Sequence, residues 1–276
     1  MGLIKEEKRA LKNILEKVGE PYLEHKRMAK GVHSNVYLLN KRYIVKFNNT
    51  ITIKGEKVFF ENNSNQYNEK IILCDNKNYS FIVYNFIEND DIDKTAINVK
   101  KLTKKMKDYV FSYKNCEWNG YGYLFEEKDT WKEFFEFEMN WRKEEAFKLM
   151  PKEEYLKVEK ALKIIDKYKF EKTILHGDLG IHNLLFKENE LIGVIDPQPI
   201  SGDRIYDYIF FIFSDIMFCK DVTIEQICND LNKEPIEKVK AMTILILFDK
   251  IIRCVRHNLK DTNMYLEIWK KYSNVL

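Results

Sequence analysis

Residues 173–202 have the sequence TILHGDLGIHNLLFKENELIGVIDPQPISG, and this stretch carries the most informative pattern in the chain. An apolar run leads into a His-Gly-Asp triplet that ends at Asp178, and a short loop then reaches Asn183. Residues 184–195 contain two apolar runs around a polar turn, which predicts a β-hairpin that ends at Asp196. Hairpin geometry brings the residue before its first strand close to the residue after its second strand.

The three polar residues of this stretch suit phosphoryl transfer. An amide oxygen from Asn183 and a carboxylate from Asp196 are hard oxygen ligands, which suit a Mg²⁺ ion that also binds phosphate oxygens. Asp178 is expected to accept a proton from a hydroxyl or to orient it. Each residue alone has an ordinary explanation as a turn or strand-ending residue. Their order and spacing favour a phosphotransfer site instead.

The two histidines of the loop allow another interpretation, a transition-metal site. His176 and His182 would supply two nitrogen ligands, but no third nitrogen or sulfur ligand lies near them in the sequence. Zinc usually takes three or four protein ligands. A structural role for His176 in the loop is therefore the favoured interpretation.

The order His-x-Asp-x-x-x-x-Asn, followed by a hairpin and an aspartate, resembles the catalytic and metal-binding loops of protein-kinase-like enzymes. The segments HGDLGIHN (176–183) and VIDPQPISGDRIYD (194–207) are more similar to the aminoglycoside phosphotransferase and choline kinase-like family. The resemblance implies a catalytic Asp178, magnesium ligands Asn183 and Asp196, and Asp207 as a brace for the catalytic loop. The chain departs from the protein-kinase pattern after Asp196, because Pro-Gln stands in place of Phe-Gly.

The distribution of periodicities predicts an α+β chain with two lobes, because short strands come first and long helices follow. The expected strands are 35–39, 42–47, 71–74 and 80–87, and the expected helices are 1–19, 99–113, 130–149, 152–168, 206–218 and 236–258. We expect an N-terminal nucleotide-binding lobe over 1–88 and a catalytic and substrate-binding helical lobe over 89–276. The resemblance implies a two-lobed protein-kinase-like fold with a small, mainly antiparallel β N-lobe and a larger helical C-lobe.

A kinase-type site also needs groups that hold the nucleotide. Gly31 and Ser34 lie in a segment similar to the sparse glycine loop of the aminoglycoside family, allowing a shift of one residue. Lys46, on an expected strand, would contact the α- and β-phosphates of ATP. A short helix over 54–63 carries Glu56, whose spacing best matches the acidic partner of that lysine.

Other parts of the nucleotide site are less determined by the sequence. Glu61 and Glu69 are the alternatives to Glu56. The linker over 84–88, including Asn85 and Ile87, is expected to bind adenine through backbone groups. The resemblance therefore implies ATP and Mg²⁺ as cofactors.

Composition excludes several other classes of protein. The 276 residues include 46 Lys and Arg and 43 Asp and Glu, a net charge of +3, so we expect no nucleic-acid partner. The five cysteines are scattered, which indicates free thiols in a reducing cytosol rather than a disulfide framework. The most apolar runs, 209–213 and 241–248, are far shorter than the ~20 residues needed to cross a bilayer. We expect a cytoplasmic protein with no membrane partner.

The acceptor is expected to be a small molecule. Only residues 197–206 separate Asp196 from Asp207, and the longer activation segment on which protein kinases bind peptides is missing. The helical lobe offers aromatic and acidic side chains for an acceptor: Trp118, Trp131, Trp141, Glu126, Glu133, Glu136, Glu138, Asp215, Asp221 and Glu225.

These side chains leave several acceptors open, because carboxylates suit a polyamine sugar and aromatic side chains suit choline. Both groups also have ordinary roles, in the core and on a solvated face. The expected function is ATP-dependent transfer of the γ-phosphate to a hydroxyl of an aminoglycoside or related amino sugar. The alternatives are a kinase of choline, a sugar or a hydroxy amino acid, and a non-catalytic nucleotide-binding protein. The sequence leaves the oligomeric state open.

Overall fold

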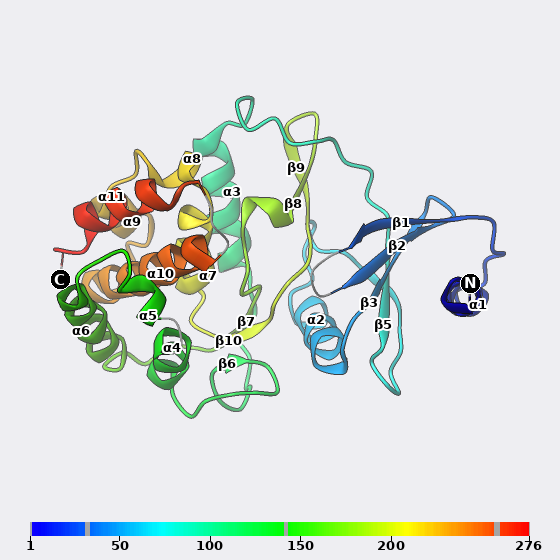
Figure 1. Ribbon diagram of the computed structural model, residues 1–276, viewed down its shortest axis with the longest axis horizontal. Coiled ribbons are helices and arrows are strands. Elements are labelled where there is room, and N and C mark those ends of the chain that lie inside the picture. The colour runs from blue at the N-terminus through cyan, green and yellow to red at the C-terminus, as the bar shows by residue number, and fades with distance from the viewer. Residues whose placement is uncertain (1, 31–33, 141–142, 257–259, 276) are drawn as a thin grey trace. The chain divides into compact units, whose positions relative to one another are not determined.

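The computed structural model describes residues 2–30, 34–140, 143–256 and 260–275. The chain forms two compact units (Figure 1). Unit 1 comprises Met1–Ile92 and Leu185–Asp196, and unit 2 comprises Asp93–Leu184 and Pro197–Leu276. The assignment of nucleotide binding to residues 1–88 and of substrate binding to 89–276 stays a prediction.

Unit 1 is built on an antiparallel sheet of five strands in the order β1-β2-β3-β5-β4. The strands are β1 (His25–Lys30), β2 (Asn35–Leu39), β3 (Tyr43–Phe47), β4 (Ile71–Cys74) and β5 (Phe81–Asn85). Four of them lie where the sequence predicts strands. Strand β1 was not predicted, because its sequence HKRMAK is dominated by cations and lacks apolar alternation.

Side chains alternate between the two faces of this sheet, and each face packs against one helix. Helix α1 (Gly2–Val18) places Leu11 and Leu15 in a core with Val45 of β3 and Val83 of β5. Helix α2 (Thr50–Asn62) lies on the other side of the sheet (Figure 1). The residue after Val45, Lys46, therefore points toward α2, and this alternation sets the direction of the site lysine.

The predicted hairpin consists of β8 (Leu184–Lys187) and β9 (Glu190–Val194). The turn residues Glu188 and Asn189 have positive φ values of 51° and 62°, a conformation typical of tight hairpin turns. Bridges from Asn68 to Val194 and from Asp90 to Phe186 join the hairpin to unit 1. Asp196 is thereby placed in the same unit as Lys46.

Unit 2 is mainly helical, and its core is organised around α10 (Ile236–Arg256), which packs against α6, α7 and α11. The other helices are α3 (Val99–Phe111), α4 (Trp131–Asn140), α5 (Lys143–Ala146), α6 (Tyr155–Ile165), α7 (Ile205–Phe213), α8 (Ile216–Cys219), α9 (Ile224–Asp230) and α11 (Thr262–Tyr272). A short 3₁₀ helix, η1 (Lys152–Glu154), leads into α6, and another, η2 (Ile181–Asn183), precedes β8. A small sheet has the order β6-β10-β7, with β6 (Gly122–Tyr123), β10 (Ile200–Gly202) and β7 (Thr173–Leu175).

The single helix predicted over 206–218 is wrong, because the structure contains α7 and α8 with a break between them. Asp215 has extended backbone angles, and its side chain accepts a hydrogen bond from the Met217 N–H, so it caps the start of α8. The prediction for 130–149 likewise corresponds to α4 and α5. Across the described ranges, no helix has the length and apolar character needed to cross a membrane.

Candidate active site

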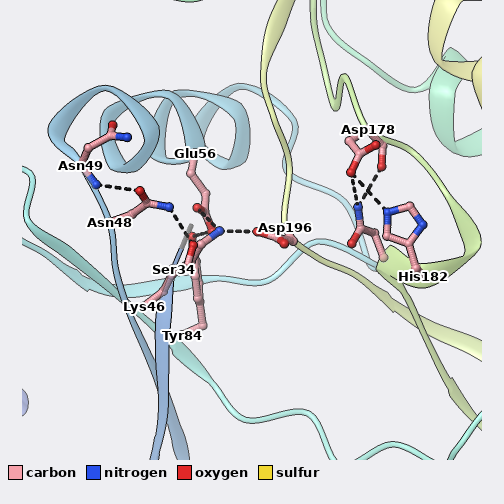
Figure 2. Close-up of polar contacts among 10 residues, drawn as sticks. Ser34, Lys46, Asn48, Asn49, Glu56, Tyr84, Asp178, His182 and Asp196 are labelled. Carbon is pink, nitrogen blue, oxygen red and sulfur yellow. Dashed lines mark hydrogen bonds and ion pairs between the residues drawn. The ribbon is translucent and has the colours of Figure 1, made fainter. Parts of the chain in front are cut away.

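Lys46 is the centre of an ionic cluster in unit 1. Its Nζ lies 2.7 Å from Glu56 Oε2 of α2 and also contacts Asp196 Oδ1 at the end of the hairpin (Figure 2). Lys46 and Glu56 are both buried, with 6% and 1% of their surface exposed. The structure therefore brings together the predicted phosphate-binding lysine, the glutamate chosen as its partner, and one predicted magnesium ligand.

Two local features fix the glutamate in this cluster. Asn49 caps the start of α2 by accepting a hydrogen bond from the Thr52 N–H, which sets where the helix begins. The Tyr84 hydroxyl donates to Glu56 Oε1 at 2.7 Å, so both carboxylate oxygens are bonded. Burial works to lower the pKa of Lys46, but the carboxylates of Glu56 and Asp196 outweigh burial and raise it. The lysine is therefore held in its charged form.

Asp196 differs from its two partners in being accessible. Its side chain is 60% exposed although one oxygen contacts Lys46. Its φ of 58° lies in the left-handed region, which aspartate tolerates better than most residues and which is often found at functional sites. An exposed carboxylate oxygen of this kind fits the chemistry of a magnesium ligand.

The predicted catalytic loop lies in unit 2 and holds Asp178 by three contacts (Figure 2). Asn183 Nδ2 donates to the backbone oxygen of Asp178 at 2.8 Å and to its Oδ2 at 3.2 Å. His182 Nε2 lies 3.2 Å from the same Oδ2. Because Asn183 is bonded through its amide nitrogen, its amide oxygen is the atom suited to a metal ion.

A cation on α10 completes the surroundings of Asp178. Arg253 Nη1 lies 3.9 Å from Asp178 Oδ1. Burial works to raise the pKa of Asp178, but the hydrogen bond with His182 and the charges of His182 and Arg253 outweigh burial and lower it. Asp178 is therefore ionised over the whole neutral range.

Asp207, at the start of α7, braces the backbone just before Asp178. Its carboxylate accepts hydrogen bonds from the His176 N–H at 2.7 Å, the Gly177 N–H at 3.0 Å and the Tyr113 hydroxyl at 3.0 Å. Burial raises the pKa of Asp207 to about 7, although these three donors favour the ionised form. The contacts agree with the bracing role that the family resemblance implies.

The histidines of the loop take different positions. His176 is buried, and its Nδ1 lies 3.3 Å from the Asp178 backbone nitrogen, whereas the side chain of His182 is 60% exposed. In the part of the chain that the structure describes, no group of three His, Cys, Asp or Glu side chains is arranged to hold a metal ion.

The remaining predicted nucleotide residues are only partly described. Gly31 lies outside the described residues. Ser34 accepts a hydrogen bond from Asn48 Nδ2 at 2.7 Å, close to the start of α2. Asn85 is exposed at the end of β5, and the Ile87 side chain packs near Gly193 of β9. Nucleotide contacts by these residues stay predictions.

The aromatic side chains proposed for the acceptor have structural roles where they are described. Trp131 is buried and stacks on Phe134, with ring centroids 5.1 Å apart. Trp118 Nε1 donates to Glu127 Oε1 at 2.8 Å. Trp141 lies outside the described residues.

The carboxylates proposed for the acceptor are also engaged in part. Glu136 pairs with Lys132, Glu133 accepts from the Asp129 N–H, and Glu138 is buried. Asp215 caps α8 and pairs with Lys94 at 2.6 Å. The sequence does not reveal the side-chain contacts of Tyr84, Tyr113 and Arg253, because nothing in it marks which distant side chain meets a motif residue.

Comparison with known proteins finds one family that matches part of the chain and solved structures that share its fold. The model of the phosphotransferase enzyme family matches residues 122–227, which include the predicted catalytic loop, the hairpin and Asp207. No curated protein matches the chain by sequence. The structure of a thermostable mutant of aminoglycoside phosphotransferase APH(4)-Ia in complex with ADP and hygromycin B has a TM-score of 0.65 and 15% identity, covering 96% of this chain and 98% of that one. The complex of APH(2")-IIIa with GDP and kanamycin has a TM-score of 0.60 and 11% identity, covering 92% and 95%.

These similarities confirm two predictions from the sequence. The chain has the α+β, protein-kinase-like fold of the aminoglycoside phosphotransferases. The resemblance to the phosphotransferase enzyme family, first drawn from the HGD and hairpin motifs, is confirmed by the family model and by these structures.

Proposed function

We propose that this protein is an ATP- and magnesium-dependent phosphotransferase that moves the γ-phosphate of ATP to a hydroxyl of a small molecule. The observation that carries the proposal is the buried Lys46–Glu56 pair in contact with an exposed Asp196. Removing a lysine and a glutamate from water costs several kcal/mol for each ion. Their mutual attraction often does no more than offset this cost, so a buried ion pair is weak evidence for a stabilising role. An exposed third group beside it fits the binding of nucleotide phosphates better than a role in the core.

The transfer step assigns Asp178 to the acceptor. The acceptor oxygen attacks the γ-phosphorus, the bond from that phosphorus to the bridging oxygen of ADP breaks, and the hydroxyl proton passes to Asp178. Because the pKa of Asp178 is lowered by its neighbours, this carboxylate is a weak base. Its main contribution is to orient the hydroxyl, which suffices for a loose transition state in which little proton transfer is needed early.

The residues fit a magnesium ion. Asp196 has an exposed carboxylate, and the amide of Asn183 is oriented by its nitrogen so that an oxygen is left for a ligand. These hard oxygen donors would hold the ion together with phosphate oxygens, and bound Mg²⁺ neutralises charge on the phosphates. Lys46 would steady the α- and β-phosphates, with Glu56 keeping its ammonium group in place.

An aminoglycoside or related amino sugar is the acceptor that the relatives support. The complexes of APH(4)-Ia and APH(2")-IIIa contain hygromycin B and kanamycin, respectively. Among the acidic residues predicted for such a substrate, Asp221 and Glu225 are exposed. Aminoglycosides therefore belong in the first panel of acceptors, with choline, sugars and hydroxy amino acids.

The proposal is tested by nucleotide binding followed by turnover. ATP is expected to raise the melting temperature only when Mg²⁺ is present, and a panel of acceptors is then screened for ADP release. Asp178→Asn is expected to bind Mg-ATP and to lose transfer, whereas Asp196→Asn is expected to lose the magnesium dependence of binding and transfer together. Lys270→Met, a change on the exposed face of α11, serves as control.

Two results would contradict the proposal. Turnover retained by both Asp178→Asn and Asp196→Asn would remove the assigned chemistry. Magnesium-dependent binding of ATP with no phosphorylated product from any acceptor would instead favour a nucleotide-binding protein on the same fold.

A further inference from the structure

The charged group next to Asp178 is a cation with unused hydrogen-bonding capacity. Arg253 projects from α10 with its Nη1 3.9 Å from Asp178 Oδ1, too far for a hydrogen bond. Its Nε donates to Asp249 Oδ2 at 2.6 Å, and its guanidinium lies over the Phe210 ring, 5.5 Å from the centroid. The side chain is 27% exposed. These contacts fix the plane of the guanidinium, and part of the side chain stays accessible.

The N–H groups on the two Nη atoms of Arg253 are the donors that a ligand would use. A guanidinium has five N–H donors, and only the Nε donor has a hydrogen-bond acceptor among the residues that the structure describes. Within the described residues, the four N–H groups on the two Nη atoms have no acceptor, so they can serve a ligand. Asp249 raises the pKa of Arg253 further above its ordinary value, so the cation does not lose its charge at any working pH.

The position of Arg253 defines what it would touch. An acceptor hydroxyl has to come within about 2.6–3.2 Å of an Asp178 oxygen in order to react. Atoms one or two bonds away from that hydroxyl then lie within reach of Nη1, which is 3.9 Å from the same carboxylate. Arg253 is thus placed to contact the substituent beside the reacting hydroxyl.

Two carboxylates of unit 2 that could meet a cationic acceptor already have partners. Asp249 accepts from Arg253, and Asp215 pairs with Lys94 while it caps α8. A second cation of α10, Lys250, donates to the Ser214 backbone oxygen at 3.0 Å. A polycationic acceptor would therefore meet a fixed positive charge beside Asp178, with these two carboxylates committed to other partners.

We infer that the acceptor carries an anionic group, a carboxylate or a phosphate, next to the hydroxyl that is phosphorylated, and that Arg253 binds it. A planar fork of N–H donors matches both anions with two parallel hydrogen bonds. The inference rests on the proposed phosphotransfer function and narrows its acceptor to hydroxy acids, hydroxy amino acids and sugar phosphates. It disfavours a bare aminoglycoside.

The test compares acceptors of different charge. ADP release is measured with glycerate, serine and glucose 6-phosphate as anion-bearing acceptors, and with glucose, choline and kanamycin as acceptors without an anion. Wild type is expected to turn over at least one of the first three faster than any of the others. Arg253→Met is expected to raise KM for that acceptor by about 30- to 100-fold, the range for losing a charge-assisted hydrogen-bonded pair, with a smaller change in kcat. The KM of Arg253→Lys for that acceptor is expected to lie between the values for wild type and Arg253→Met.

The variants have to remain folded for this comparison. Arg253→Met removes one cation that pairs with the buried Asp249, so the double change Arg253→Met with Asp249→Asn removes both charges of this pair together. Melting temperatures are measured for each protein. Lys270→Met removes a cation that pairs with Glu267 on α11 and controls for net charge. If KM for the anion-bearing acceptor rises in both the single and the double variant but not in Lys270→Met, Arg253 binds the anionic group.

Each outcome decides the inference. An equal fall in kcat for all acceptors, with KM unchanged, would show that Arg253 only positions Asp178 and would overturn the inference while the proposed function stands. Turnover restricted to glucose, choline or kanamycin would overturn it in the same way. If nothing is turned over, the proposed function fails, and calorimetric titration of glycerate, serine and glucose 6-phosphate into the complex with AMP-PNP decides the anion site. Binding of any one that is lost in Arg253→Met supports the inference, and no binding overturns it.

Discussion

Gly177 offers a sharp test of how the catalytic loop is held, and the change to test is Gly177→Ala. The residue has a φ of +77°, where side chains are disfavoured. A Cβ atom added there would lie 2.0 Å from the backbone oxygen of Gln198, and 3.5 Å from a side-chain carbon of Ile200. The atom in the way is backbone, so no rotation of a side chain can relieve the overlap.

The expected cost has two parts. The left-handed backbone costs an alanine roughly 1 kcal/mol. Moving the Gln198 carbonyl by more than 1 Å disturbs the hydrogen bond from the Gln198 N–H to the His176 oxygen, now 2.8 Å, which is worth about 1 kcal/mol, and leaves buried groups poorly bonded for about 1 kcal/mol more. The total of about 3 kcal/mol corresponds to a fall in melting temperature of roughly 6–12 °C.

Gly19→Ala is the matched control. Gly19 has a similar φ of +82°, but nothing lies within 4 Å of an added Cβ, so this change carries only the backbone cost of about 1 kcal/mol. Thermal unfolding followed by circular dichroism compares the two variants with wild type. If the melting temperature falls no further in Gly177→Ala than in Gly19→Ala, the close packing of the loop against residues 197–199 is refuted.

Three further predictions concern charged groups of the site. Glu56→Gln is expected to lower the free energy of unfolding in urea by about 3 kcal/mol, the low end for breaking a buried pair, because Lys46 loses its buried counter-charge. An unchanged urea midpoint would argue against the pair. Burial raises the pKa of Asp207 to about 7, above its unfolded value near 3.9, so the stability it contributes is complete below about pH 4 and is lost as the pH rises through 7. The stability gap between wild type and Asp207→Asn should accordingly be wider at pH 5 than at pH 8, and a gap that widens with pH would contradict this. Because the neighbours of Asp178 lower its pKa in spite of burial, the acid limb of kcat/KM should lie below about pH 4, and an Asp178-dependent limb near pH 6 would be inconsistent.

Much of the fold could be predicted from local patterns. The strands at 35–39 and 71–74 were predicted with the bounds that the structure has, and the hairpin over 184–195 forms with its turn at Glu188 and Asn189. Alternation and turn chemistry are local properties, so they are readable in the sequence. Strand β1 was missed because it pairs only with β2 at the sheet edge and carries little apolar signal.

Some residues of the candidate site can likewise be predicted from the sequence, whereas one depends on tertiary packing. Motif spacing in the sequence identifies Asp178, Asn183, Asp196 and Lys46. In the structure, Asn183 contacts Asp178 and Lys46 contacts Asp196. Arg253 could not be predicted, because its approach to Asp178 depends on how α10 packs within unit 2.

The side chains proposed for the acceptor show the limit of composition. Trp131 looked suitable for a ligand, but it fills the core beside Gly202, where an added Cβ would overlap its ring. Burial depends on tertiary packing, and an aromatic residue at helical spacing carries no mark of which side it faces. A list of aromatic and acidic residues therefore cannot identify an acceptor.

The central claim is that Asp178 enables transfer of a phosphoryl group from ATP to a small hydroxyl compound. Mass spectrometry of acceptors incubated with the protein, ATP and Mg²⁺ measures that transfer directly. We predict that one acceptor gains the mass of a single phosphoryl group with wild type, and that Asp178→Asn yields no such product although it still binds Mg-ATP. Equal product from wild type and Asp178→Asn would contradict the account.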